Sequence, residues 1–186
     1  MTNPVMQAID QRRSIRAYTG EQISREHLDI LLSAALDSPS ARNSQPWHFT
    51  VVQKQELIEK INRLAVEQMK KDADEAALAR LNQPGYTIFH GAPTVIFLSA
   101  DSQGRYAALD CGIAVQNIAL AAHSLHLGSV ILGMPRSAFE GPEKEALEKE
   151  LDFPEGSSFQ IAIAVGHPAA GKEKHPVDDG KITILA

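Results

Sequence analysis

The segment from Arg105 to Leu127 constrains the fold more than any other part of the chain, because it is apolar on nearly every side. Small and aliphatic residues fall on all faces of the helix that it would form: Ile113, Ala114, Ile118, Ala119, Leu120 and Ala122. A helix that is apolar all round must be covered on all sides to be stable in water. We therefore expect it at the centre of the fold or in a subunit interface, with Gly128 ending it.

Two other apolar segments have the length and composition of buried strands. One is TVIFLSA, which follows Pro93, and the other runs from Ser158 to Val165. Continuous runs rich in β-branched residues are typical of strands that are covered on both faces. Residues 48–53 alternate well enough to form a strand, and residues 129–134 are expected to be extended.

Helices are expected between these strands. Starts, stops and apolar spacing predict them over 4–11 with Asn3 as cap, over about 24–36 with Ser24 as cap, over 54–81 before Pro84-Gly85, and over about 141–151. Helices and strands interleave without a regular strand–helix–strand rhythm, which favours an α+β fold with a sheet flanked by helices. At 186 residues we expect one domain, 1–186.

The C-terminal end closes with an apolar, strand-like segment, Ile182 to Leu185. It has no obvious partner strand within one small domain. Because an unpaired strand edge is a template for pairing with another chain, we expect this tail to pair with a second copy.

Three arginines, Arg12, Arg13 and Arg16, lie within five positions just after the first expected helix. The whole chain carries a net charge of -5, so a concentrated basic cluster points to a bound anion. In an extended segment Arg12, Ser14 and Arg16 share a face, and guanidinium groups bind phosphate oxygens in pairs. The alternative is a solvated basic patch that pairs with surface carboxylates.

The loop from Ser38 to Trp47 places hydroxyl and amide groups beside the only tryptophan. Such groups suit a planar heterocycle edged with hydrogen-bond donors and acceptors. The alternative is a surface loop that satisfies its own polar groups while Trp47 anchors the core.

Several functional classes are disfavoured. An acidic chain without a broad basic face argues against nucleic-acid binding, and we find neither a signal-peptide core nor an apolar run that could span a bilayer, so we expect a cytoplasmic protein. Glycine-rich nucleotide motifs are missing.

His123 and His126 have metal-compatible spacing without an evident third ligand, so we expect no metal there. The single cysteine, Cys111, is most simply a core residue.

The arginine cluster and the loop belong to an ordered series of motifs. R-x-S-x-R begins at Arg12, and P-S-x-x-N-x-Q-P-W-x-F begins at Pro39. They are followed by Gln116-Asn117, by LGS and ILG within 127–133, and by Gly166-His167-Pro168 with two lysines beyond it. Together these segments resemble the nitroreductase family of flavoproteins over most of the chain.

This resemblance implies a nitroreductase-like fold, with a mostly antiparallel or mixed sheet flanked by helices and a C-terminal tail strand exchanged in a homodimer. It implies FMN at the dimer interface. The phosphate and ribityl end would be held by Arg12, Ser14, Lys172 and Lys174, with Arg13 and Arg16 beside them.

The flavin ring would be reached from other segments. Asn43 and Gln45 would meet its edge, or Ser38, Pro39 and Ser40 would reach it from the second subunit. Main-chain groups at Ile131, Leu132 and Gly133 would donate to flavin N5, and Gln116 belongs to the same implied site. The middle region is short, so a reduced lid is expected, with Tyr86, Phe89 and His90 as candidates for the substrate pocket. Ordinary packing is their alternative.

The implied activity is a ping-pong transfer of hydride from NADH or NADPH, through flavin N5, to a small-molecule acceptor such as a nitroaromatic or a quinone. No side chain need act as acid or base, because the cofactor carries the chemistry. The alternatives are a non-catalytic FMN-binding or sensor protein, a flavin-fragmenting or dehalogenating relative of the same fold, and a cofactor-free phosphate-binding module.

Overall fold

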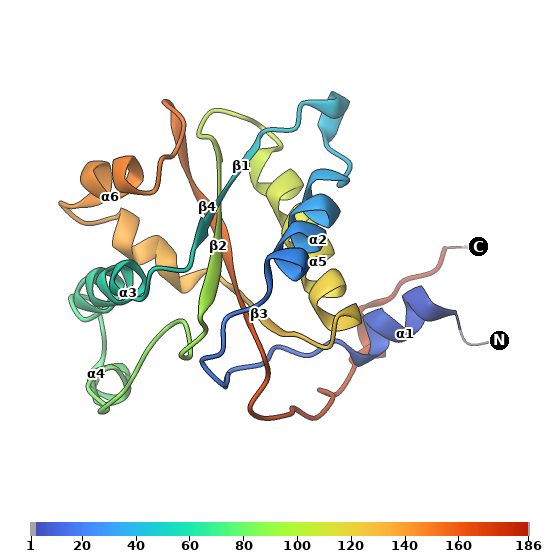
Figure 1. Ribbon diagram of the computed structural model, residues 1–186, viewed down its shortest axis with the longest axis horizontal. Coiled ribbons are helices and arrows are strands. Elements are labelled where there is room, and N and C mark those ends of the chain that lie inside the picture. Colours follow the sequence, from blue (N-terminus) through green and yellow to red (C-terminus); the bar gives the residue numbers. More distant parts are fainter. Residues whose placement is uncertain (1–2, 186) are drawn as a thin grey trace.

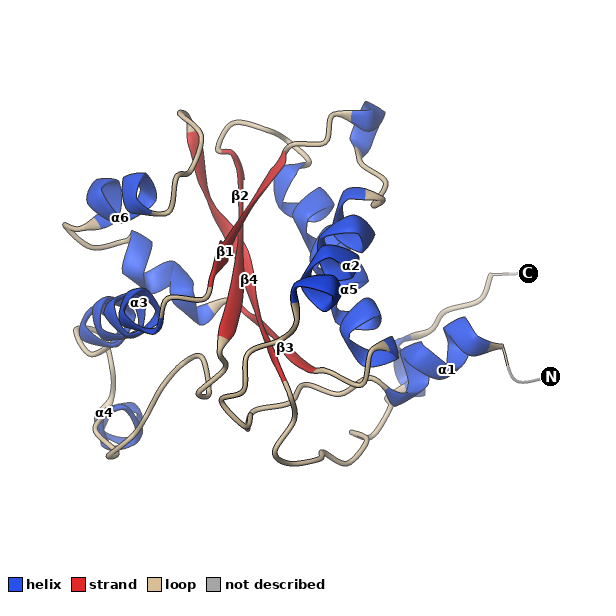
Figure 2. Cartoon of the chain, viewed as in Figure 1, coloured by secondary structure: helices blue, strands red, loops and turns tan. Residues whose placement is uncertain are grey.

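The computed structural model describes residues 3–185 and is built on one four-stranded sheet (Figures 1 and 2). The strands are β1 (Trp47–Val52), β2 (Thr94–Asp101), β3 (Gly128–Leu132) and β4 (Ser157–Gly166). They lie in the order β1-β2-β4-β3, and every neighbouring pair is antiparallel. The sequence-based expectation of an α+β fold with a sheet flanked by helices is confirmed.

Helices cover both faces of the sheet, as Figure 2 shows. On one side lie α1 (Pro4–Gln11), α2 (Arg25–Leu36) and α5 (Ala107–Ser124), and on the other lie α3 (Gln55–Met69), α4 (Glu75–Leu81) and α6 (Lys144–Glu150). Side chains of a strand alternate between its two faces, so β2 sends Ile96 and Leu98 into the first core and Val95 and Phe97 into the second. The sheet therefore separates two apolar cores.

The central position of α5 is confirmed, because eight of its residues are buried and it packs on the sheet and on α2. Its end differs from the expectation. His126 takes the left-handed conformation (φ 58°), and Leu127 N–H donates to Ala122 C=O at 2.8 Å. That pattern ends the helix with a left-handed residue two positions before Gly128. Gly128 instead begins β3.

The single helix expected over 54–81 is wrong, because the structure has two helices there. α3 ends at Met69, and α4 starts after Asp74, whose side chain accepts a hydrogen bond from Ala77 N–H at 2.8 Å. An aspartate at this position caps a new helix. Because charged residues lie on both sides of the break, the spacing of apolar residues in the sequence does not show it.

The tail from Ile182 to Leu185 forms no strand within the described residues, and its apolar side chains lie open: Ile184 is 84% exposed and Leu185 94%. Figure 1 shows the C-terminal segment passing beside α1, which also carries the exposed side chains of Val5, Met6 and Ile9. Pairing of the tail with a second copy stays a prediction. None of the described helices combines the length and the apolar character that crossing a bilayer requires.

Candidate functional site

The arginine cluster is fixed between the start of β3 and the segment that follows β4. Ile15 N–H donates to Ser129 C=O at 2.9 Å, and Thr19 N–H donates to His167 C=O at 3.0 Å. In return, Ala169 N–H donates to Ala17 C=O at 2.9 Å. Residues from the two ends of the chain are thus joined by main-chain hydrogen bonds, and these place 168–172 beside the cluster.

Two glycines that face each other in the sheet allow the 14–18 segment to cross closely over β3 and β4. Gly128 and Gly166 lie opposite each other in β3 and β4. A Cβ on Gly128 would lie 2.9 Å from Ile15 Cγ2, and one on Gly166 would lie 2.7 Å from Pro93 Cδ. The Cβ on Gly166 would also lie 3.1 Å from Tyr18 Cδ1. These distances are shorter than van der Waals contact, so the close approach of the 14–18 segment requires glycine at these positions.

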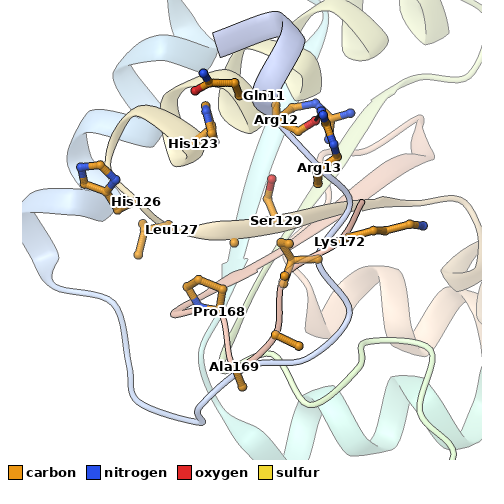
Figure 3. Close-up of a pocket in the computed structure, with 14 residues that line it drawn as sticks. Gln11, Arg12, Arg13, His123, His126, Leu127, Ser129, Pro168, Ala169 and Lys172 are labelled. Carbon is orange, nitrogen blue, oxygen red and sulfur yellow. Dashed lines mark hydrogen bonds between the residues drawn. The ribbon is translucent and has the colours of Figure 1, made fainter. Parts of the chain in front are cut away.

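The cluster opens into a cavity of about 530 Å³. Figure 3 shows Arg12 and Arg13 near Ser129 of β3, with His123 on the neighbouring helix α5 and Lys172 on the C-terminal segment. An adjoining hollow of about 300 Å³ is lined by Ser14 and Lys174 as well as by Arg12, Arg13 and Lys172. The cationic side chains from the two ends of the chain therefore meet at one place.

The charges in this cavity differ in how they are compensated. Lys174 forms an ion pair with Asp10, and this hydrogen bond lowers the pKa of the Asp10 carboxyl. The Arg13 guanidinium donates to Asp10 C=O at 2.6 Å and to Arg12 C=O at 2.8 Å. Within the described residues, no carboxylate pairs with Arg12 or Lys172. Cationic side chains that have no carboxylate partner are free to form charge-assisted hydrogen bonds with a phosphate group.

The pKa of His123 is lowered by burial and in part by the same positive charges. Its pKa lies below the ordinary value, because burial disfavours the charged form and the charges of Arg12, His126 and Arg13 add to that effect. Arg16 is exposed, and its Nη1 donates to Ser14 C=O at 3.5 Å. Arg16 therefore lies beside the cavity and is not part of its lining.

The loop 38–46 forms a second group of expected site residues. Three of its non-glycine residues have left-handed φ angles: Arg42 (55°), Asn43 (55°) and Gln45 (45°). Gln45 N–H donates to Ser40 Oγ at 2.9 Å, and Gln45 Nε2 donates to Asn43 Oδ1 at 3.2 Å. Pro39, Asn43 and Gln45 are exposed, and Trp47 is buried in the first core. The loop is therefore held in a specific shape with its polar side chains outward.

The two groups lie toward opposite ends of α5 within one protomer (Figure 1). Asp110 near the start of α5 accepts a hydrogen bond from Ala41 N–H, and His123 near its end lines the cavity with Arg12. Thirteen helical residues span about 20 Å. The loop tip and the arginine cluster are therefore well separated in the same copy of the chain.

The end of β3 offers its main chain and not its side chains. Leu132 is 3% exposed and packs in the second core, so its side chain points away from solvent. The space beside Gly133 is open, because no atom lies within 4 Å of a Cβ built there. Ile131 is half-buried at the first core, and Gln116 is half-buried on α5.

The expected pocket residues of the shortened lid divide into two kinds. Phe89 has no exposed surface and packs edge-on against Phe97 at 6.0 Å between ring centres, so in this protomer it is a core residue and does not line a pocket. Tyr86 packs against the second core and is half-buried. His90 is half-buried in a left-handed conformation, and burial, with the charge of Arg16, lowers its pKa.

Other reactive groups are poor candidates for chemistry. Burial, and then the charge of Asp110, raises the pKa of Cys111 to about 12, so its thiol is protonated at neutral pH. Among the described residues, no group of three or more metal-binding side chains comes together. The sequence analysis considered His123 only as a metal ligand and missed Asp110, whose only signal was a polar side chain inside an apolar helix.

The model of the nitroreductase family matches residues 9–167. The chain belongs to the nitroreductase family. A crystal structure of a nitroreductase with bound FMN from Desulfitobacterium hafniense is 34% identical, with each chain covered completely and a TM-score of 0.93. The FMN reductase [NAD(P)H] of Bacillus subtilis is 32% identical over 94% of this chain and 70% of its own length. The iodotyrosine deiodinase of Thermotoga neapolitana is 26% identical over 89% of each. The family is one of oxidoreductases.

Proposed function

We propose that this chain is an FMN-dependent oxidoreductase that takes hydride from NADH or NADPH and reduces nitroaromatic, quinone or similar small acceptors. One observation carries the proposal: Arg12 and Lys172, from the two ends of an acidic chain, line one cavity without a carboxylate partner in the described residues. That arrangement fits the phosphate of FMN, the cofactor seen in the nitroreductase of D. hafniense.

Each group of side chains has a distinct role in this proposal. Arg12 and Lys172 bind the phosphate, and the Ser14 hydroxyl donates to its ester or ribityl oxygens. Lys174, paired with Asp10, fixes the C-terminal segment and adds positive charge. The open main chain at Gly133 leaves room for the flavin ring beside β3.

The separation of the two groups supports a site shared between two protomers. The loop 38–46 cannot reach the arginine cluster of its own copy, because the two lie toward opposite ends of α5. A second copy can bring its loop to that cluster. We therefore infer a homodimer in which Ser38, Pro39, Ser40, Asn43 and Gln45 of one chain face the FMN held by the other.

FMN bound at this site would supply the redox chemistry, carrying hydride between a nicotinamide and an acceptor that use the same space in turn, which is a ping-pong scheme. The protein's part is binding and orientation. Positive charge from Arg12, Arg16 and Lys172 favours the more negative reduced form of the cofactor and so raises its potential. No side chain is required as an acid or base, and the protonated thiol of Cys111 agrees with this.

Dehalogenation is the second candidate, because a deiodinase is among the relatives at 26% identity. A non-catalytic FMN-binding protein and a flavin-fragmenting enzyme would use the same cavity.

The absence of a disulfide partner for Cys111 fits a reducing compartment such as the cytoplasm.

An anaerobic titration separates these functions. Purified protein, loaded with FMN, is titrated with NADH and with NADPH while its flavin absorbance is followed, and an acceptor panel that includes iodotyrosine is then added. We expect rapid bleaching by at least one nicotinamide and rapid recovery with nitroaromatics or quinones. Iodide release alone would favour the deiodinase. A yellow protein that does not bleach would show a binding role, and one that never retains FMN would contradict every flavin-dependent function.

A further inference from the structure

The loop 38–46 adopts a conformation that ordinary residues avoid, so something outside the loop must hold it. Left-handed backbone at Arg42, Asn43 and Gln45 is unfavourable for residues that carry a Cβ. Such strain persists only where the surroundings over-determine it, and it is common where ligands bind. The hydrogen bonds within the loop orient Asn43 toward Gln45, but they do not attach the loop to the protein.

Ser38 is hydrogen-bonded to the end of α2, and two polar residues of α5 attach the loop to that second helix. The Asp110 carboxylate accepts from Ala41 N–H, with its two oxygens at 3.2 and 3.3 Å, and Asn117 Nδ2 donates to Ser38 Oγ at 2.8 Å. Seven residues make nearly two helical turns, so Asp110 and Asn117 lie on the same face of the helix. They therefore contact the loop at two points along a rigid rod.

These two side chains are exceptions in a helix that is otherwise apolar on its buried side. Asp110 is only 3% exposed, and its neighbours at the core are Ala107, Cys111 and Ala114. Burying a carboxylate is unfavourable unless it is hydrogen-bonded. The loop N–H of Ala41 supplies that hydrogen bond, and packing alone would be served better by an apolar residue.

We propose that Asp110 and Asn117 are positioning residues that fix the loop 38–46, so that Asn43 and Gln45 are presented in one orientation to the flavin edge. This role rests on the proposed FMN-dependent function. Neither residue touches the flavin itself. Their effect passes through the main chain at Ala41 and the hydroxyl of Ser38, the two points at which α5 holds the loop.

Substitutions on α5 test this role. Asp110→Ala and Asn117→Ala each remove one attachment, and Asp110→Asn keeps an oxygen that can accept from Ala41 N–H. Cys111→Ala is the matched control, because Cys111 is fully buried beside Asp110 and contacts only the core. For each variant we would measure the Kd of FMN, the circular dichroism of the bound flavin, amide hydrogen exchange of 38–46 without FMN, and the urea midpoint.

We expect Asp110→Ala and Asn117→Ala to weaken FMN binding about tenfold, as when a buried polar group loses its partner. Their flavin dichroism should change and the loop amides should exchange faster, whereas Asp110→Asn restores most of each property. Cys111→Ala should lower the urea midpoint alone. Unchanged loop exchange and dichroism in both alanine variants would overturn the positioning role, as would equal changes in Cys111→Ala. If the parent chain bound no FMN, the proposed function would fall as well.

Discussion

At the scale of single residues, the site depends on charges that have no internal partner. Arg12 and Lys172 line the cavity without a carboxylate among the described residues, whereas Arg25 pairs with Asp29 on an exposed helix surface. Losing the first kind of charge removes a ligand contact. Losing the second kind affects only a solvated ion pair, which contributes little to stability.

Arg12→Ala or Lys172→Ala should therefore yield protein depleted in flavin. Each substitution removes a charge-assisted hydrogen bond of about 1.5–3 kcal/mol, which corresponds to a Kd for FMN that rises by roughly 10-fold to 150-fold. Fluorescence titration of FMN measures the change. Arg25→Ala serves as the control, since it removes the same charge on α2 and should leave the Kd unaltered. Full FMN occupancy in both site variants would remove these residues from the phosphate site.

The lowered pKa of His123 predicts how the stability of the FMN-free protein depends on pH. Its pKa in the folded chain lies below the ordinary 6.5, so between the two values the unfolded chain binds more protons. The stabilisation is complete above 6.5 and is lost as pH falls through the folded pKa. His90 shifts in the same direction. The urea concentration at the unfolding midpoint should be lower at about pH 5.5 than at about pH 7.5. His123→Gln should make that difference smaller. An equal fall in His123→Gln and the parent would contradict this.

At the scale of elements, the crossing of the 14–18 segment over β3 and β4 depends on Gly166. An added Cβ would lie 2.7 Å from Pro93 Cδ and 3.1 Å from Tyr18 Cδ1, and neither ring can move freely. Gly166→Ala should lower the free energy of unfolding by about 1–3 kcal/mol. Because Tyr18 belongs to the arginine segment, FMN binding should weaken too.

Urea unfolding and FMN titration check this expectation together. Gly141→Ala is the control, because the nearest atom to its added Cβ is a flexible Gln68 side chain at 3.5 Å. A Gly166→Ala protein as stable as the parent would show that β3, β4 and the crossing segment are less tightly packed than the structure has them.

The sequence predicted those elements whose ends carry local chemistry. Asn3 and Ser24 cap α1 and α2 as expected, with side chains that accept from Val5 N–H and His27 N–H. The break before α4 and the left-handed His126 were not predicted. The first is hidden among charged residues, and the second takes a conformation for which glycine is the usual residue.

At the scale of the whole molecule, the family resemblance grouped Arg12 with Lys172, and the fold supplies the physical reason that the motifs do not contain. Arg12 and Lys172 are distant in sequence and line one cavity, while the loop that carries Asn43 is closer to Arg12 in sequence and lies toward the opposite end of α5. The main-chain hydrogen bonds of the 15–19 segment, together with its close approach to Gly128 and Gly166, explain the first result. The family motifs identified the residues, and the fold divides them into two groups that one copy cannot join.

This division makes a shared site testable by complementation. One chain carries Arg12→Ala with Lys172→Ala, and the other carries Asn43→Ala with Gln45→Ala. In a mixed dimer, one site receives both sets of substitutions and the other receives neither. If each site used residues of a single chain, both sites of the mixed dimer would be damaged.

The deciding measurement is the FMN content of that mixed dimer, purified through two different affinity tags and compared with both variant homodimers. A site shared between protomers predicts weak FMN binding in each homodimer and, in the mixed dimer, about half an FMN per chain, bound with the affinity of the parent protein. A mixed dimer that binds FMN no better than the homodimers would contradict the shared site.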